Sequence, residues 1–201
     1  MHEAARIKRS LVDVNDSVLI VIDIQDYFLR KYDRAKSQRV TSHVAWLLLV
    51  ARHLKVPVIA TAEDIDRNGG VTDAIAAALP PGTPVHDKDV FNLVDEATIM
   101  ASVLATGRGT AICVGVETDV CVAHSAMGLL SMGYNVVIPQ DGVASMETDE
   151  EIGLMRMQSA GAVISSVKAL YYEWMRGVSQ VRAFRALVPE IEEQRPPSLV
   201  L

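Results

Sequence analysis

A short apolar run near the start of the chain, residues 18–22 (VLIVI), constrains the fold more than any other segment. The run shows no alternation of polar and apolar residues. A strand formed by it is therefore buried on both faces, which is the environment of a strand inside a parallel sheet. The run ends at Asp23. The sequence thus predicts an α/β fold with Asp23 at the carboxyl end of a buried strand.

The rest of the chain repeats this order of a short apolar run followed by a segment of helical periodicity. Strands are also expected at residues 58–61, 85–88, 110–114, 135–139 and 162–164, and helices at 44–54, 71–79, 95–105, 119–132, 149–160 and 166–176. Alternating strands and helices are typical of a parallel sheet covered on both faces. The predicted fold class is therefore a three-layer αβα, Rossmann-like arrangement with a six-stranded parallel sheet, and residues 1–201 are interpreted as a single domain.

Composition narrows the classes of partner. The formal net charge is −6 and no cluster of basic residues stands out, which argues against nucleic acid or an anionic membrane. The N-terminal segment has no apolar stretch typical of a signal peptide, and the longest apolar runs are too short to span a bilayer. Two cysteines do not form a disulfide framework. We therefore expect a cytoplasmic protein that acts on a small molecule.

Three reactive side chains fall where strands are expected to end. Asp23 follows the first strand, Lys88 follows the third, and Cys121 lies near the start of the helix after the fourth. Ligands of open parallel sheets bind outside the carboxyl ends of the strands. A helix N-terminus and a nearby ammonium both favour a thiolate, and a carboxylate can act as general base. The three residues predict a cysteine-nucleophile hydrolase.

Each of these residues alone also has a structural interpretation. A cysteine is often a small buried apolar residue, as we expect for Cys113 inside the fourth strand. Lys88 alone could be a solvated loop residue, and Asp23 could cap a neighbouring loop.

Three segments together resemble the isochorismatase-like cysteine hydrolase superfamily, which includes nicotinamidases and N-carbamoylsarcosine amidohydrolase. They are VLIVIDIQDYF, HDKDVF and VGVETDVCVAHSAMGLLSMGYNVVIPQDGVAS, and the resemblance covers residues 16–176. It implies a catalytic triad of Asp23, Lys88 and Cys121. It also implies a cis peptide bond between Val116 and Glu117, with the backbone N–H groups of Glu117 and Cys121 forming an oxyanion hole.

The chain departs from the metal-binding members of this superfamily after the second strand. Those members carry histidines there, whereas residues 61–66 read TAEDID. Glu63, Asp64 and Asp66 could hold a hard cation through oxygen ligands, but an acidic run in a loop is more often a solvated face. The sequence therefore predicts no metal and no cofactor.

Cys121 favours cleavage of a C–N bond, because authentic isochorismatases, which cleave a vinyl ether, lack the nucleophilic cysteine. The expected substrate is a small amide or ureido compound, hydrolysed through a thioester. Candidate substrate-binding residues are Tyr27, Phe28, Glu63 and Phe91. An ether or ester hydrolase, or a catalytically silent binding or scaffold protein, remains an alternative.

The resemblance also implies a homo-oligomer, a dimer or larger. The apolar helical residues 155–160 and 170–175 are candidates for its interface, and Trp46 or Trp174 is a candidate contact. The tail around residues 195–197 is expected to be loose.

Overall fold

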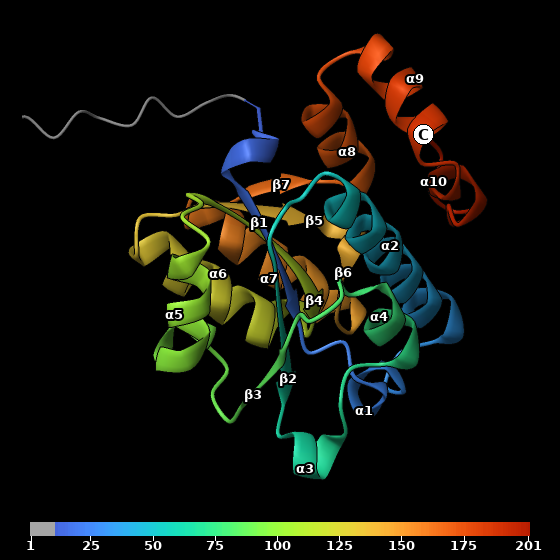
Figure 1. The fold of residues 1–201 in the computed structure, drawn as a ribbon. Helices are drawn as coiled ribbons and strands as arrows, with labels where there is room; N and C mark the ends of the chain where they lie inside the picture. The colour runs from blue at the N-terminus through green and yellow to red at the C-terminus, as the bar shows by residue number, and fades with distance from the viewer. Residues whose placement is uncertain (1–10) are drawn as a thin grey trace, which may run out of the picture.

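The computed structural model describes residues 11–201, and its centre is a parallel sheet (Figure 1). Six strands lie in the order β3-β2-β1-β4-β5-β7, and the short strand β6 pairs with β4 beside them. The predicted parallel α/β sheet is confirmed, with β6 as a strand that the sequence did not predict. The strands are β1 (Ser17–Ile22), β2 (Val58–Glu63), β3 (Val85–Lys88), β4 (Thr110–Val116), β5 (Asn135–Pro139), β6 (Val143–Ala144) and β7 (Val163–Ser165).

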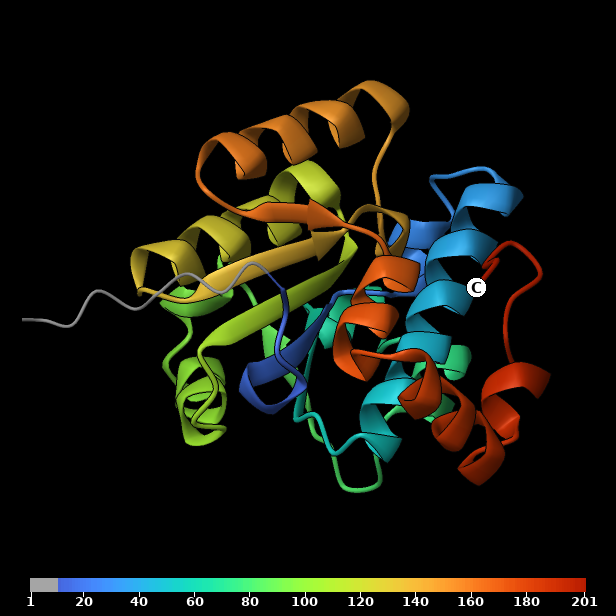
Figure 2. The same cartoon turned by 90° about the horizontal axis from the view of Figure 1, so that it is seen from above.

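Helices cover both faces of the sheet, and each face has its own apolar core (Figure 2). Leu19 and Val21 of β1 belong to the core beneath α2, α4, α8 and α9. Val18, Ile20 and Ile22 belong to the core beneath α5, α6 and α7. The run is uninterrupted because β1 is buried on both faces. The helices are α1 (Asp26–Leu29), α2 (Arg34–His53), α3 (Ile65–Asn68), α4 (Asp73–Ala78), α5 (Ala97–Ala105), α6 (Ala123–Ser131), α7 (Glu147–Ser159), α8 (Val167–Met175), α9 (Val178–Leu187) and α10 (Glu190–Glu193), with shorter helical turns at Val14–Asp16, Leu93–Asp95 and Gln140–Gly142.

The register of the central strands brings their carboxyl ends to one edge of the sheet. Ile22, the last residue of β1, pairs with Thr61 of β2 on one side and with Gly115 of β4 on the other. Glu63 at the end of β2 pairs with Lys88 at the end of β3. Side chains that follow these strands are therefore neighbours in space.

Gly115 lies inside β4, whereas the sequence predicted that the strand would end before it. Its φ is 131°, and a Cβ atom there would lie 1.9 Å from the carbonyl oxygen of Ile22. The close approach of β1 and β4 leaves room only for glycine. The residue that resembles a strand break in the sequence is thus a contact between two central strands.

The segment that carries Cys121 begins as a π-helix, Thr118–Val122, and continues as α6. The sequence predicted a single α-helix over residues 119–132. The carbonyl oxygen of Glu117 accepts hydrogen bonds from the N–H groups of Val120 and Val122, at 3.2 and 3.1 Å. These bonds fix the wider first turn, and Cys121 lies within it.

The C-terminal segment, expected to be loose around residues 195–197, instead lies on α2. The Trp46 indole donates a hydrogen bond to the carbonyl oxygen of Ile191 at 2.8 Å. The Nε2 atom of His43 lies 2.9 Å from the hydroxyl oxygen of Ser198. The expectation was wrong because buried groups of α2 hold this segment.

Both tryptophans proposed for an oligomer contact are buried within the chain. Trp46 is 2% exposed and Trp174 is 3% exposed, and the Trp174 indole donates to the hydroxyl of Ser17 at 3.1 Å. Leu170, Tyr171 and Met175 are buried too, where α8 contacts α2 and α9, whereas Tyr172 is 39% exposed. The apolar face of this helix is therefore largely part of the core.

Within residues 11–201, no helix has the length and apolar character needed to cross a membrane. The expectation that the chain lacks a signal peptide falls largely on residues 1–10, which lie outside the described residues.

Candidate active site

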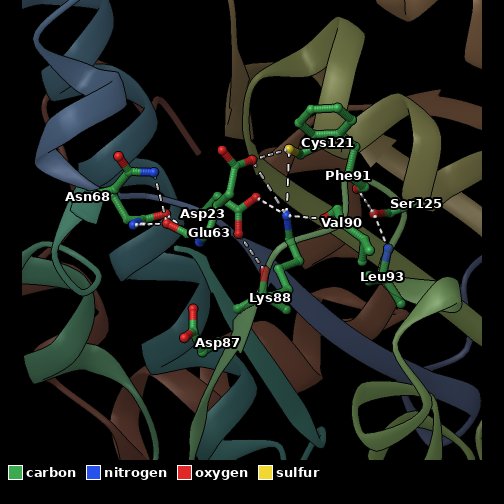
Figure 3. Close-up of polar contacts among 12 residues, drawn as sticks. Asp23, Glu63, Asn68, Asp87, Lys88, Val90, Phe91, Leu93, Cys121 and Ser125 are labelled. Atoms are coloured by element: carbon green, nitrogen blue, oxygen red, sulfur yellow. Dashed lines mark hydrogen bonds and ion pairs between the residues drawn. The ribbon is translucent and has the colours of Figure 1, made fainter. Parts of the chain in front are cut away.

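The structure brings Asp23, Lys88 and Cys121 together at the carboxyl edge of the sheet, in a contact cluster drawn in Figure 3. The Nζ atom of Lys88 lies 2.7 Å from the Oδ2 atom of Asp23 and 3.6 Å from the Sγ atom of Cys121. Lys88 also donates a hydrogen bond to the carbonyl oxygen of Val90 at 2.9 Å. All three reactive residues are buried, with exposures of 0%, 2% and 3%. The ammonium group thus bridges the carboxylate and the thiol.

Asp23 adopts a left-handed backbone conformation, with φ of 53°, directly after β1. Its N–H group donates to the carbonyl oxygen of Thr61 at 3.1 Å. The Thr61 hydroxyl in turn donates to the Oδ1 atom of Asp23 at 2.8 Å. Thr61 therefore orients the carboxylate, a role that the sequence analysis did not assign. Its position as the last residue of the strand expected at 58–61 was the available signal.

Glu63 contacts the candidate nucleophile directly. The Cys121 thiol donates a hydrogen bond to the Oε2 atom of Glu63 at 3.2 Å, and the same oxygen lies 3.9 Å from Lys88 Nζ (Figure 3). The Glu63 side chain is 20% exposed, whereas those of Lys88 and Asp23 are not exposed at all. The residue expected to contact substrate thus also forms part of the nucleophile's surroundings.

Gln25 and Asn68 hold the backbone at Glu63. The Gln25 side chain accepts a hydrogen bond from the Glu63 N–H group at 2.7 Å and donates to the Glu63 carbonyl oxygen at 2.9 Å and to the Gly69 carbonyl oxygen at 2.6 Å. Asn68 also donates to the Glu63 carbonyl oxygen, at 3.0 Å. Gln25 lies in the segment VLIVIDIQDYF, which carried part of the resemblance, but the segment did not reveal this function of Gln25.

Burial and the two carboxylates raise the pKa of the Cys121 thiol. Burial raises the pKa of Cys121 above its ordinary value of 9.0, and the charges of Asp23 and Glu63 raise it further, while Lys88 lowers it. We expected the helix start and Lys88 to favour a thiolate. The effect of Lys88 has the predicted sign, but the prediction was wrong overall because desolvation and two nearby negative charges dominate.

The partners of the thiol respond differently to burial. Burial raises the pKa of Asp23 above 3.8, against the opposing effects of Lys88 and Thr61. For Lys88, burial lowers the pKa, but the negative charges around it outweigh burial and the pKa lies above 10.5. The cluster therefore holds the ammonium group of Lys88 beside the carboxylate of Asp23. Burial makes this carboxylate more basic, as a general base requires.

The turn between β4 and the π-helix contains the predicted oxyanion-hole residues. The peptide bond between Val116 and Glu117 is cis, as the resemblance implies. The Glu117 side chain forms an ion pair with Lys31, Oε1 to Nζ at 3.0 Å. Glu117 and Cys121 thus lie in one turn at the carboxyl end of β4.

The candidate aromatic residues lie in two different places. Phe28 is buried in the core beneath α2, and the Tyr27 ring meets it edge to face at 5.2 Å between centroids. The Phe91 side chain belongs to the loop after Lys88, is 51% exposed, and lies 6.1 Å from the His124 ring. Phe91 lies on the segment that contacts the cluster through Val90, whereas the Tyr27 and Phe28 rings contact Lys31, the partner of Glu117.

One group of potential metal ligands is present among residues 11–201: the ligand atoms of Asp23, Glu63 and Cys121 lie within 4.8 Å of one another. Lys88 Nζ lies among these atoms and supplies a positive charge there. Of the acidic loop residues considered in the sequence, Glu63 belongs to this group and Asp64 and Asp66 do not.

Comparisons with known proteins agree with this arrangement of elements. The isochorismatase domain family matches residues 17–169. Isochorismatase domain-containing protein 2A of Mus musculus is 26% identical over 199 residues, covering 98% of this chain and 93% of the relative. The YcaC gene product from Escherichia coli, described as an octameric hydrolase of unknown specificity, has a TM-score of 0.79 at 22% identity, covering 92% of this chain and 94% of that chain. N-carbamoylsarcosine amidase from Thermoplasma acidophilum has a TM-score of 0.64 at 18% identity, covering 76% of this chain and 96% of that chain.

The two solved structures show that this chain has a similar fold. The family match shows in addition that its sequence is related to that family. The matched residues include the strands that end at the cluster and the turn that carries Cys121. The resemblance found in the sequence is thereby confirmed, and the chain belongs to the isochorismatase family of hydrolases.

Proposed function

We propose that this hydrolase cleaves a C–N bond of a small amide or ureido substrate through a thioester on Cys121. The observation that carries the proposal is the buried contact of the Cys121 thiol with Lys88 at 3.6 Å, and of Lys88 with Asp23 at 2.7 Å. A nucleophile, a base and a fixed positive charge are what acyl transfer from nitrogen requires.

In the first half of the proposed reaction, Asp23 takes the proton of the Cys121 thiol as the sulfur attacks the carbonyl carbon. Lys88 remains protonated and stabilises the developing thiolate. Because the pKa of the thiol is raised, the proposed mechanism couples proton transfer to attack. The protonated Asp23 then gives its proton to the departing nitrogen, and ammonia or an amine leaves. In the second half, Asp23 takes a proton from water, which attacks the thioester. The C–S bond breaks, the acid leaves, and Asp23 returns the proton to the Cys121 sulfur.

The negative oxygen formed in each half-reaction needs hydrogen-bond donors. We assign the backbone N–H groups of Glu117 and Cys121 to this role. Support comes from their shared turn, which the bonds from Val120 and Val122 to the Glu117 carbonyl oxygen hold in shape. A donor of this kind contributes about 3–4 kcal/mol to transition-state stabilisation.

A screen for ammonia release over a panel of small amides and ureido compounds tests the proposal. The native protein should release ammonia from at least one compound, and the Cys121→Ala variant should release none. Cys113→Ala is the matched control, because Cys113 is buried in the core beneath α5 and α6 and should leave turnover intact. Turnover that survives in Cys121→Ala would contradict the mechanism.

Two other functions give different results in the same experiments. An ether or ester hydrolase would leave the amide panel unchanged but act on an ester panel. A silent binding protein would act on neither and would show no acyl adduct on Cys121. The similar fold of N-carbamoylsarcosine amidase favours the C–N substrate class among these.

We also propose that the chain forms a homo-oligomer, since the similar YcaC protein is described as octameric. Ile152 and Met155 on α7 and Val163 on β7 are 50%, 62% and 49% exposed, and they supply apolar surface near the β7 edge of the sheet. Light scattering after size exclusion tests this, and a monomer at micromolar concentration would contradict it.

A further inference from the structure

Glu63 combines contact with the nucleophile and contact with solvent. Its Oε2 atom accepts the thiol hydrogen bond of Cys121, and its side chain is 20% exposed. We propose that Glu63 determines specificity: it selects amide or ureido substrates that carry a positive charge close to the scissile bond, and it disfavours substrates that carry a carboxylate there. The inference rests on the proposed function and names the substrate class.

The first argument is that the backbone which carries the carboxylate is held in place. Gln25 binds both the N–H group and the carbonyl oxygen of Glu63, at 2.7 and 2.9 Å, and Asn68 binds the same carbonyl oxygen. The backbone at position 63 is therefore fixed at the end of β2. A charged group on a fixed backbone is partly preorganised, so less ordering is needed when a ligand binds.

The second argument is the charge balance around the sulfur. Asp23 and Glu63 are two carboxylates, and the contacting cation is the single ammonium of Lys88. Lys88 lies 2.7 Å from Asp23 but 3.9 Å from Glu63, so it neutralises the buried carboxylate more fully than the exposed one. Two carboxyl groups share one ammonium group, and Glu63 is the one that lies farther from it.

The third argument is the direction of the thiol. At rest the Cys121 thiol donates to Glu63, whereas the proposed reaction needs its proton to pass to Asp23. A cationic substrate group that binds the Glu63 carboxylate competes for the oxygen that holds the thiol. The thiol is then released toward Asp23, so the binding of a positive group and activation of the sulfur are coupled at one residue. An anionic group meets repulsion and leaves the thiol bound.

Charged thiol reagents measure this field without a known substrate. Aminoethyl methanethiosulfonate is cationic and sulfonatoethyl methanethiosulfonate is anionic; with each, the thiolate attacks the sulfenyl sulfur, a disulfide forms and methanesulfinate leaves. Both react with the same thiolate, so the ratio of the two rate constants does not depend on the thiol pKa. The rates are followed by intact-protein mass spectrometry in a Cys113→Ala background, and each ratio is divided by that of a free small thiol.

We expect the corrected ratio to favour the cationic reagent in the native site and to fall about tenfold in Glu63→Gln, which keeps the size of the side chain and removes its charge. Asp66→Asn is the matched control, because it removes the same charge from an exposed residue of α3, three positions along the chain, and should leave the ratio within about twofold. A ratio in Glu63→Gln that stays within about twofold of the native value would overturn the inference. So would the failure of Cys121 to react with either reagent, since a selecting group must be reachable.

A substrate comparison separates this inference from the proposed function. Glycinamide, propionamide and succinamate are small amides of positive, neutral and negative charge. If the chain hydrolyses amides, kcat/KM should decrease in that order, and Glu63→Gln should reduce the preference about tenfold. If no amide is hydrolysed while the reagent ratio responds to Glu63, the proposed function fails and the charge selection stands. If amides are hydrolysed with no response to Glu63, the inference alone fails.

Discussion

Lys88 and Asp23 lie 2.7 Å apart, Nζ to Oδ2, and neither side chain is exposed to solvent. A buried ion pair of this kind is costly to disrupt, because removing one partner leaves the other charge buried without compensation. The two residues that the mechanism uses for base and cation are therefore also structural partners, and their activity and stability effects must be measured together.

The ion pair gives a first prediction. Lys88→Met and Asp23→Asn should each lower the free energy of unfolding by about 3–5 kcal/mol, while the double variant loses less than the sum of the two. Urea denaturation of all four proteins measures this. Losses that add without coupling would mean that the contact contributes little in solution.

Thiol reactivity gives a second prediction, with opposite signs for two substitutions. Lys88 lowers the pKa of Cys121 and Glu63 raises it. Lys88→Met should therefore move the pH profile of iodoacetamide alkylation to higher pH, and Glu63→Gln should move it to lower pH. The rate is measured from pH 6 to about 10 in a Cys113→Ala background. If both variants shift the profile in one direction, changes of shape rather than charge control the thiol.

The proposed thioester gives a third prediction. Acid quenching during turnover should trap an acyl adduct, seen as a mass increment on the peptide that contains Cys121. Cys121→Ala should show no adduct. Cys113→Ala should show the same adduct as the native protein, because burial raises the pKa of Cys113 to about 12 and removes it from the reaction. An adduct on another residue would require a different nucleophile.

Gly115 gives a fourth prediction. Gly115→Ala should cost at least about 3 kcal/mol of stability, because its φ of 131° is unfavourable for alanine and the new Cβ would lie 1.9 Å from the Ile22 carbonyl oxygen. Gly133→Ala is the matched control, with φ of 87° and no atom within 4 Å of the added Cβ. It should cost only about 1 kcal/mol. Equal losses in the two variants would show that β1 and β4 can separate without penalty.

Asp141 gives a fifth prediction, on pH. Burial alone would raise its pKa, but hydrogen bonds from His43 and from the Val167 N–H group outweigh burial, and the pKa lies below 3.8. The charged form therefore stabilises the fold above pH 3.8, and this contribution is lost as the pH falls through the folded pKa. Asp141→Asn should lose about 1–3 kcal/mol at pH 7. Urea denaturation should show a smaller difference from the native protein at pH 3, and a constant difference would contradict the assignment.

The sequence predicted those parts of the fold that depend on local pattern. Residues 18–22 read as a doubly buried strand because every position contacts an apolar core, and Asn135–Pro139 was predicted with the bounds that the structure shows. Gly115 was misread because its glycine requirement arises from Ile22, a residue on a different strand. The start of α2 at Arg34 was missed because its first turns are polar and carry no apolar periodicity.

In the candidate site, too, the features set by local sequence pattern were predicted, and those set by contacts between distant segments were not. Asp23, Lys88 and Cys121 could be named from the sequence because each lies at or just beyond the carboxyl end of a predicted strand. The bond from Cys121 to Glu63 could not, because it depends on how far β2 extends, and the sequence ended that strand at residue 61 whereas the structure ends it at Glu63. The raised pKa of the thiol was likewise missed, since burial and a second carboxylate are properties of the assembled site.

The hydrogen bonds of Gln25 have a consequence for how such an enzyme can diversify. They hold the backbone at position 63 through a side chain on the segment between β1 and α1, and they use no atom of the Glu63 side chain. A substitution there can change the charge or shape beside the reactive sulfur and keep these backbone bonds. Position 63 is thus a natural starting point for directed evolution of new substrate preferences on this scaffold.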